Sequence, residues 1–210
     1  MTKPSRDDLR LLDAHGTLND SPEMASARIR TALTFLVDCV QTSAGIKSGE
    51  LKPKAGTLRL TGHTEPSETH RRRGELALQA FASNLPRAAQ AIAISAAHTA
   101  LTEKFGTLPD PDQPTLSELD TLRWFVCLIQ RCYAYDPLRP KWDLDGKGRD
   151  SRFQFPTLGI DVDTSTLDGQ RFDPLILGGT GGFMRLVDHC RKIIDEAETH
   201  GARANHAIQS

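Results

Sequence analysis

Apolar residues recur at helical spacing in five stretches of the chain, and Gly or Pro stands at most breaks between them. The first stretch, 20–45, carries an apolar stripe of Met24, Ile29, Leu33, Leu36, Val37 and Val40. Spacings of three and four residues are typical of an amphipathic helix. Pro22 suits the first turn of this helix, and Gly45 is its predicted stop.

The region 67–106 predicts two further helices with Pro86 at their boundary. Ser67 can cap the first helix, and Pro86 opens the second because proline is tolerated in a first helical turn. Gly106 ends the second helix. Between 45 and 67 the chain is rich in Gly, Lys, Pro and Thr, which indicates a long loop.

The clearest helical pattern begins at Thr115 and ends at Asp136. Thr115 is the predicted N-cap, and Glu118 stands three residues on, as a capping box requires. Pro137 and Pro140 then prevent the helix from continuing.

Alternating and β-branched residues replace the helical pattern after Trp142. Asp-Gly turns there predict two or three short strands, with one hairpin around 146–148. The stretch 181–201 predicts a last amphipathic helix with apolar positions at Phe183, Leu186, Val187, Cys190, Ile193 and Ile194.

These elements predict a mainly α protein, a helical bundle of about five helices with a small β/loop subdomain near 141–180. A flexible N-terminal arm (1–18) precedes the bundle (19–140). A β/loop insertion and a C-terminal helix packed on the bundle follow (141–200), and a tail ends the chain (201–210). At 210 residues the chain is long enough to bury a core without disulfides.

Composition restricts the classes of function. The formal net charge is −1, so nucleic acid would have to be held by a local basic patch. The four cysteines form no CxxC pair and no signal peptide is recognisable, which predicts a reduced, cytoplasmic protein. No apolar stretch reaches the length of a membrane span and no cofactor or metal motif is evident, so we expect no membrane partner, no cofactor and no metal.

The helix predicted from Thr115 is apolar on two sides. One side holds Leu119, Leu122, Val126, Ile129 and Tyr133, and the opposite side holds Asp120, Trp124, Leu128, Arg131 and Tyr135. Such a helix is either central in a bundle or covered by a second subunit. We therefore predict that Trp124 and Leu128 form an interface with a homodimer partner or another protein.

A guanidinium, a phenol and a carboxylate are expected to converge where this helix ends. Arg131 and Tyr135 are four residues apart and share a face, and Asp136 follows directly. We predict these three as a candidate catalytic site, with Arg139 and Lys141 as phosphate contacts.

A structural interpretation of the same residues stays open. Arg131 would stack on Tyr135 or pair with a carboxylate, and Asp136 would cap or turn the chain. Trp142 would anchor the following loop to the core.

The stretch 123–142, RWFVCLIQRCYAYDPLRPKW, resembles small bacterial helical proteins of the HEPN type. The resemblance implies an often dimeric bundle in which an Arg and a His near one helix end form a metal-independent ribonuclease centre at the dimer interface. It places Arg131 at the Arg of the family and Tyr135 where the family has His. Because a tyrosine phenol is a poor general base at neutral pH, it implies a degenerate site that binds RNA or a partner without cutting, or one that uses another acid or base.

Three other clusters each have a functional and a simpler interpretation. The basic run Arg71, Arg72 and Arg73 is a candidate for phosphate contact or a solvated helix face. The glycines of 176–186 suggest a phosphate cradle, but they match neither common phosphate motif and also suit a strand-to-helix turn. Asp161, Asp163 and Asp168 suggest a divalent ion or the outward face of an edge strand.

Two hypotheses follow. The first is a HEPN-like protein that binds or processes RNA in a toxin or phage-defence setting, and that would be a metal-independent endoribonuclease if it is an enzyme. The second is a non-catalytic helical protein whose second apolar helix face contacts a copy of itself or another protein.

Overall fold

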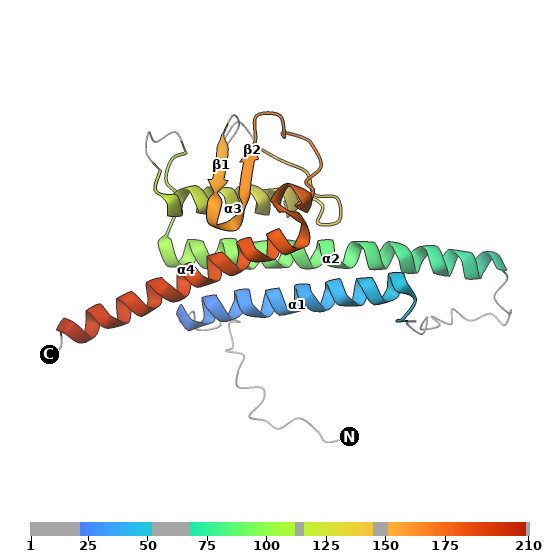
Figure 1. Ribbon diagram of the computed structural model, residues 1–210, viewed down its shortest axis with the longest axis horizontal. Coiled ribbons are helices and arrows are strands. Elements are labelled where there is room, and N and C mark those ends of the chain that lie inside the picture. The colour runs from blue at the N-terminus through green and yellow to red at the C-terminus, as the bar shows by residue number, and fades with distance from the viewer. Residues whose placement is uncertain (1–21, 52–67, 112–115, 145–150, 209–210) are drawn as a thin grey trace, which may run out of the picture.

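The computed structural model describes residues 22–51, 68–111, 116–144 and 151–208, and the arm predicted at 1–18 lies outside them. Within these residues, four helices pack together beside a small antiparallel hairpin (Figure 1), which confirms the mainly α fold class. The helices are α1 (Pro22–Ser48), α2 (Glu68–Phe105), α3 (Glu118–Ala134) and α4 (Gly179–Ile208). The remaining elements are β1 (Arg152–Phe155), β2 (Ile160–Asp163) and two short 3-10 helices, η1 (Pro156–Leu158) and η2 (Pro174–Leu177).

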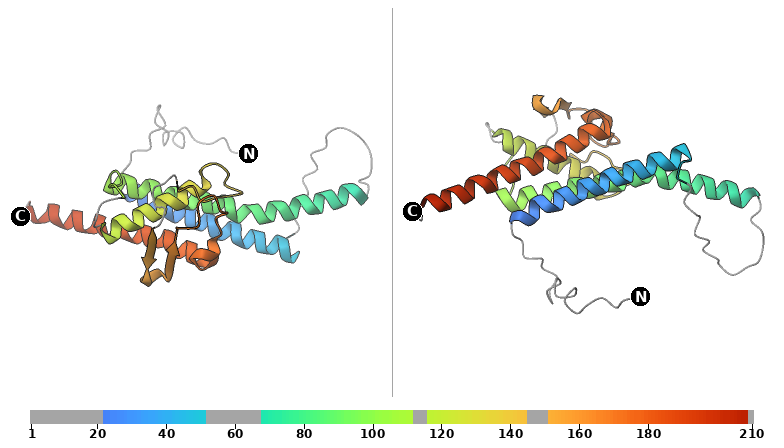
Figure 2. Two further views of the ribbon diagram at one scale, coloured as in Figure 1. Left: turned by 90° about the horizontal axis from the view of Figure 1, so that it is seen from above. Right: turned by 60° about the horizontal axis from the view of Figure 1, so that its bottom comes forward.

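The helices α1 and α2 lie side by side, as Figure 1 and Figure 2 both show. Seven of the buried residues of α1 follow one another at spacings of four and three: Ala25, Ile29, Ala32, Leu36, Cys39, Ser43 and Ile46. This heptad repeat turns one continuous stripe toward α2. The helix continues through the predicted stop at Gly45 to Ser48, where Gly49 follows with a left-handed φ of 80°.

A single helix, α2, replaces the two helices that were predicted to meet at Pro86. Proline has no N–H, so the carbonyl of Ala82, four residues earlier, loses its partner within the helix. The Ser43 hydroxyl of α1 donates to this buried carbonyl at 2.6 Å. The helix continues past Pro86 because a neighbouring helix supplies the missing hydrogen bond.

The hairpin covers one side of α3. The ring of Phe125 on α3 lies 5.0 Å from that of Phe153 and 5.5 Å from that of Phe155, both on β1. β1 and β2 pair antiparallel with their apolar residues buried and the acidic residues of β2 exposed, as an edge strand requires. The hairpin predicted around 146–148 lies outside the described residues.

The last helix, α4, packs on the bundle through the apolar face that its sequence predicts. The buried residues of this face are Phe183, Leu186, Val187, Cys190 and Ile194. The helix continues past its predicted end at Gly201 to Ile208, so the predicted tail is helical over 201–208. One glycine inside a helix costs only about 1 kcal/mol, which is too little to stop it here. None of the described helices combines the length and the hydropathy needed to cross a membrane.

Candidate functional site

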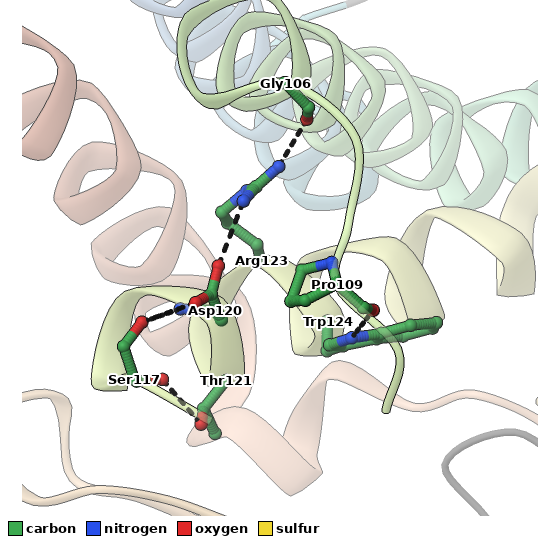
Figure 3. Close-up of polar contacts among 7 residues, drawn as sticks. All are labelled: Gly106, Pro109, Ser117, Asp120, Thr121, Arg123 and Trp124. Atoms are coloured by element: carbon green, nitrogen blue, oxygen red, sulfur yellow. Dashed lines mark hydrogen bonds and ion pairs between the residues drawn. The ribbon is translucent and has the colours of Figure 1, made fainter. Parts of the chain in front are cut away.

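A serine and an aspartate fix the start of α3, as Figure 3 shows. The Ser117 hydroxyl accepts the Asp120 N–H at 3.0 Å and donates to the Asp120 carboxylate at 2.7 Å. Ser117 is therefore the N-cap, two residues after the predicted Thr115, which lies outside the described residues. Asp120 stands three residues after this N-cap, as Glu118 does after Thr115, but its carboxylate accepts from the Ser117 hydroxyl, whereas a capping box uses the backbone N–H of the N-cap.

The segment that follows α2 lies against the first turns of α3, where the second apolar face begins (Figure 3). Arg123, although charged, is buried, donates to the Gly106 carbonyl and pairs with Asp120 at 3.0 Å. The indole N–H of Trp124 donates to the Pro109 carbonyl at 3.1 Å. The chain itself therefore occupies the place that a second subunit was expected to take.

The predicted interface of Trp124 and Leu128 is consequently wrong, because both side chains are buried within one copy of the chain. A helix apolar on two sides is either central or covered by another subunit, and α3 is central. The covering segment 106–111 follows α2 and has no apolar periodicity of its own, so the sequence pattern does not place it.

Arg131 is held by an ion pair within the chain. Its guanidinium lies 3.3 Å from the carboxylate of Asp143, and both side chains are partly buried. This contact ties the last turn of α3 to the segment that follows Trp142. Asp143 is thus the carboxylate partner that we expected for Arg131 if the role of Arg131 is structural.

Asp136 and Tyr135 have different surroundings from Arg131. The Asp136 carboxylate accepts the backbone N–H groups of Leu138 at 2.9 Å and Arg139 at 3.2 Å, so it turns the chain. Tyr135 is the C-cap of α3, and its side chain is 87% exposed. In the described part of the chain, the phenol makes no hydrogen bond or ring contact.

The backbone beyond α3 is fixed by an isolated antiparallel bridge between Lys141 and Arg171. Next to the bridge, the Trp142 N–H donates to the Gln170 carbonyl at 2.8 Å. The buried Trp142 ring meets Phe172 edge to face at 5.4 Å, which confirms Trp142 as an anchor. Two basic residues thus project from a backbone that the core holds in place.

Beside this bridge lies a surface hollow of about 690 Å³, which we call the basic hollow. It is lined by Asn84, Arg87, Asp136, Leu138, Arg139, Lys141 and Arg171. Four of these residues are cationic and one is acidic, whereas the whole chain has a net charge of −1. None of the four cations forms an ion pair with a residue that the structure describes. Such a local excess of positive charge attracts anions.

Only some of the residues that line the basic hollow were predicted from the sequence. Arg139 and Lys141, the predicted phosphate contacts, both line it. Arg87 and Arg171 were missed because they come from α2 and from the segment after β2, far away in the chain. The one available signal was that Arg87 is the only charged residue between positions 76 and 97.

The acidic cluster of β2 is engaged within the chain. Asp161 forms an ion pair with Arg152 at 2.7 Å, and the hydrogen bond from Arg152 lowers the pKa of that carboxyl to about 2. Asp163 and Asp168 accept backbone N–H groups of the chain. In the described ranges, no group of three or more His, Cys, Asp or Glu side chains is placed to hold a metal ion.

The other two phosphate candidates differ in what the structure describes. The glycines of 176–186 form a turn: Gly178 has a φ of 85°, and a Cβ at Gly182 would lie 1.6 Å from the Leu177 carbonyl oxygen. The left-handed backbone at Gly178 and the close packing at Gly182 therefore account for these two glycines. The side chains of Arg71, Arg72 and Arg73 lie outside the described residues, although their backbone belongs to α2.

The cysteines supply no reactive thiol to the site. All four are free, as expected for a reduced chain. Burial raises the pKa of the Cys132 thiol, and it raises that of Cys190 to about 12. A thiol that stays protonated at neutral pH is a poor nucleophile.

None of the family models, curated proteins or solved structures compared with the chain matches it. The resemblance of 123–142 to HEPN-type proteins therefore stays a prediction. The candidate function rests on the geometry and charge of the basic hollow.

Proposed function

We propose that the chain binds single-stranded RNA through the basic hollow and does not cleave it at Arg131 and Tyr135. The proposal rests on one observation: four cationic residues and only one acidic residue line this concave surface. Phosphate groups supply most of the affinity of proteins for nucleic acids, and Lys and Arg are their usual partners.

The fixed backbone around the basic hollow supports phosphate binding. Lys141 and Arg171 stand opposite each other in an antiparallel bridge, and Lys141 N–H also donates to the Cys132 carbonyl at 3.0 Å. Side chains presented from an ordered backbone lose less entropy on binding than side chains on a loose loop. Arg139 follows from the turn that Asp136 holds, so its backbone is also fixed.

The exposed phenol of Tyr135 supports a single-stranded ligand. Tyr135 precedes Asp136, which lines the basic hollow, and its ring is available on the surface. Unpaired bases stack on exposed aromatic rings, whereas paired bases are already stacked within a duplex. Phosphates in the hollow and a base on Tyr135 would together select a single strand.

Two contacts argue for binding without cleavage. The Arg131 guanidinium is engaged by Asp143, and the Asp136 carboxylate is engaged by backbone N–H groups of its own turn. The position that the HEPN resemblance assigns to a histidine is Tyr135, and a phenol is a poor general base at neutral pH. The predicted catalytic trio therefore lacks the histidine of the family, and its guanidinium is already paired.

Fluorescence anisotropy with a labelled mixed-sequence RNA strand tests this proposal. Lys141→Ala and Arg171→Ala should each weaken binding for all sequences alike, because a phosphate contact carries no sequence information. Arg30→Ala is the matched control, since Arg30 is an exposed cation in the part of α1 that meets Glu103 and not in the part beside Ala82 and the hollow. Equal affinity of all three variants would contradict the assignment of the hollow.

Tyr135 gives a separate test of stacking and of chemistry. Tyr135→Ala should cost about 1–3 kcal/mol of binding free energy, whereas Tyr135→Phe keeps the ring and should bind like the wild type. The RNA should stay intact with all of these proteins on a sizing gel. Cleavage by the wild type that Tyr135→Phe or Arg131→Ala abolishes would show a catalytic site instead.

A further inference from the structure

A second hollow lies near the start of α3, at the opposite end of this helix from the basic hollow, and we call it the apolar pocket. Its volume is about 510 Å³, and it forms where the end of α2, the start of α3, the end of β1 and the middle of α4 meet. Figure 1 shows α4 crossing α2 in this region. The lining residues are Phe105, Glu118, Leu119, Leu122, Phe155, His189, Ile193, Glu196 and Ala197.

The walls of the apolar pocket belong to the folded core. Leu122 and Phe155 are buried, and the Phe155 ring lies 5.5 Å from the ring of Phe125. The buried Arg123 ties the start of α3 to the end of α2, because its guanidinium donates to the Gly106 carbonyl (Figure 3). The pocket is therefore formed before a ligand binds, as is usual for small-molecule sites.

The lining of the apolar pocket combines an apolar surface with negative charge. Six of its nine residues are apolar, two are glutamates and one is a histidine, so the lining contains no Lys or Arg. This charge is opposite in sign to that of the basic hollow. The apolar surface favours an organic ligand, and the two carboxylates favour a positive charge on that ligand.

The basic residues beside the apolar pocket pair with other carboxylates. Arg123, which packs behind the end of α2, forms an ion pair with Asp120 at 3.0 Å. On α4, Lys192 pairs with Asp188, four residues before it, at 3.0 Å. Glu196, four residues after Lys192, forms no ion pair with any residue that the structure describes, and the same is true of Glu118. Both glutamates are thus available to a positively charged ligand.

The local structure explains only one of the two glutamates, and a metal ion does not fit the pocket. Glu118 is the first residue of α3, where a negative charge stabilises the helix dipole. Glu196 lies inside α4, away from both helix ends, so the dipole does not account for it. Calcium and magnesium ions need several oxygen ligands, whereas the described ranges hold no group of three or more acidic, His or Cys side chains placed for one. An organic cation is therefore the better match.

We propose that the apolar pocket binds a small organic ammonium ion. The apolar body of this ligand lies against Phe105 and Ile193, and its positive charge lies beside Glu118 and Glu196. The volume of the pocket falls within the range of about 300–1,000 Å³ that is usual for small-molecule sites. The apolar pocket and the basic hollow share no lining residue, so this proposal does not depend on RNA binding.

Three probes of nearly the same shape but different charge test the proposal: phenylpropylammonium, phenylpropanol and phenylpropanoate. In NMR titrations of the full chain, the ammonium should shift the amide signals at the start of α3 and in the middle of α4. It should bind about tenfold more tightly than the alcohol, and the carboxylate should bind most weakly. Added salt should reduce the preference for the ammonium, because ions screen exposed charges.

Variants of the two glutamates test whether they cause this preference. Glu118→Gln and Glu196→Gln should each reduce the preference for the ammonium over the alcohol, and the double variant should abolish it. Glu75→Gln is the matched control, because Glu75 is an exposed glutamate on α2 about 45 Å along the helix from Phe105. All three glutamates are exposed, so the spectra of the variants should otherwise match that of the wild type.

Ala197→Leu tests the location of the site. The larger side chain fills part of the apolar pocket, so this variant should bind the ammonium and the alcohol more weakly than the wild type. The proposal would be overturned by equal affinity of the wild type for the two probes, or by no binding of the ammonium at millimolar concentration. A preference for the ammonium that survives in the Glu118→Gln, Glu196→Gln double variant would overturn it as well.

Discussion

The hydrogen bond from Ser43 to the Ala82 carbonyl should contribute far more to the free energy of unfolding than an ordinary serine hydrogen bond. Pro86 lacks the N–H that would otherwise bind this carbonyl, and the Ser43 hydroxyl replaces it at 2.6 Å in a buried position. Ser43→Ala leaves a buried carbonyl without a partner, which costs about 1–3 kcal/mol. For a chain of this size, a loss of about 2 kcal/mol lowers Tm by roughly 4–8 °C.

A double-mutant cycle with Pro86→Ala isolates the effect. The alanine introduced by this substitution has an N–H, so the Ala82 carbonyl would be satisfied within the helix without Ser43. The cost of Ser43→Ala should then fall by about 1–2 kcal/mol in that background. Denaturant unfolding followed by far-ultraviolet circular dichroism measures all four free energies of unfolding.

Ser26 provides a matched control on the same helix. It is also buried, but its hydroxyl has no hydrogen-bond partner among the described residues, so Ser26→Ala should be neutral or stabilising. If Ser43→Ala cost no more than Ser26→Ala, or cost the same with and without Pro86, the proposed replacement of the missing N–H would be refuted.

Two further sites give sharp expectations. Gly182→Ala should lower Tm strongly, because the added Cβ would lie 1.6 Å from the Leu177 carbonyl oxygen. Gly181→Ala is the control and should be tolerated, because its Cβ meets only the far end of a flexible side chain at 3.8 Å. Similar Tm values for the two variants would contradict this packing. In an NMR titration, the Asp161 carboxyl should have a pKa of about 2, and Arg152→Ala should raise that pKa toward the ordinary range. The ion pair therefore stabilises the fold at pH values above the ordinary aspartate pKa, and this stabilisation is lost as the pH falls toward 2. An unchanged pKa of Asp161 in the variant would argue against the ion pair.

Local chemistry predicts most helices of this fold but not their lengths. The apolar face of α4 and both apolar faces of α3 are visible in the sequence, because helical spacing is a local property. Pro86 predicts a boundary when only its neighbours are considered, since its effect depends on Ser43 in another helix. Gly45 and Gly201 likewise predict stops, but tertiary packing outweighs the modest cost of a glycine inside a helix.

The candidate site was predictable only where its parts are neighbours in sequence. Arg139 and Lys141 follow the end of α3 and were identified, whereas Arg171 reaches the hollow only through the bridge to Lys141. Trp124 is buried in the core, and an apolar pattern alone cannot assign such a residue to a core or to an interface. For both Arg171 and Trp124, the local sequence pattern does not show which distant segment of the chain packs beside the residue.

The salt dependence of RNA binding tests the central claim most directly. For single strands, the slope of log K against log salt is about −0.7 for each phosphate that a protein neutralises. Replacing Arg139, Lys141 and Arg171 together by Ala should therefore make the slope shallower by about 2 units relative to the wild type. An identical slope for the two proteins, or no RNA binding by the wild type at low salt, would contradict RNA recognition by the basic hollow.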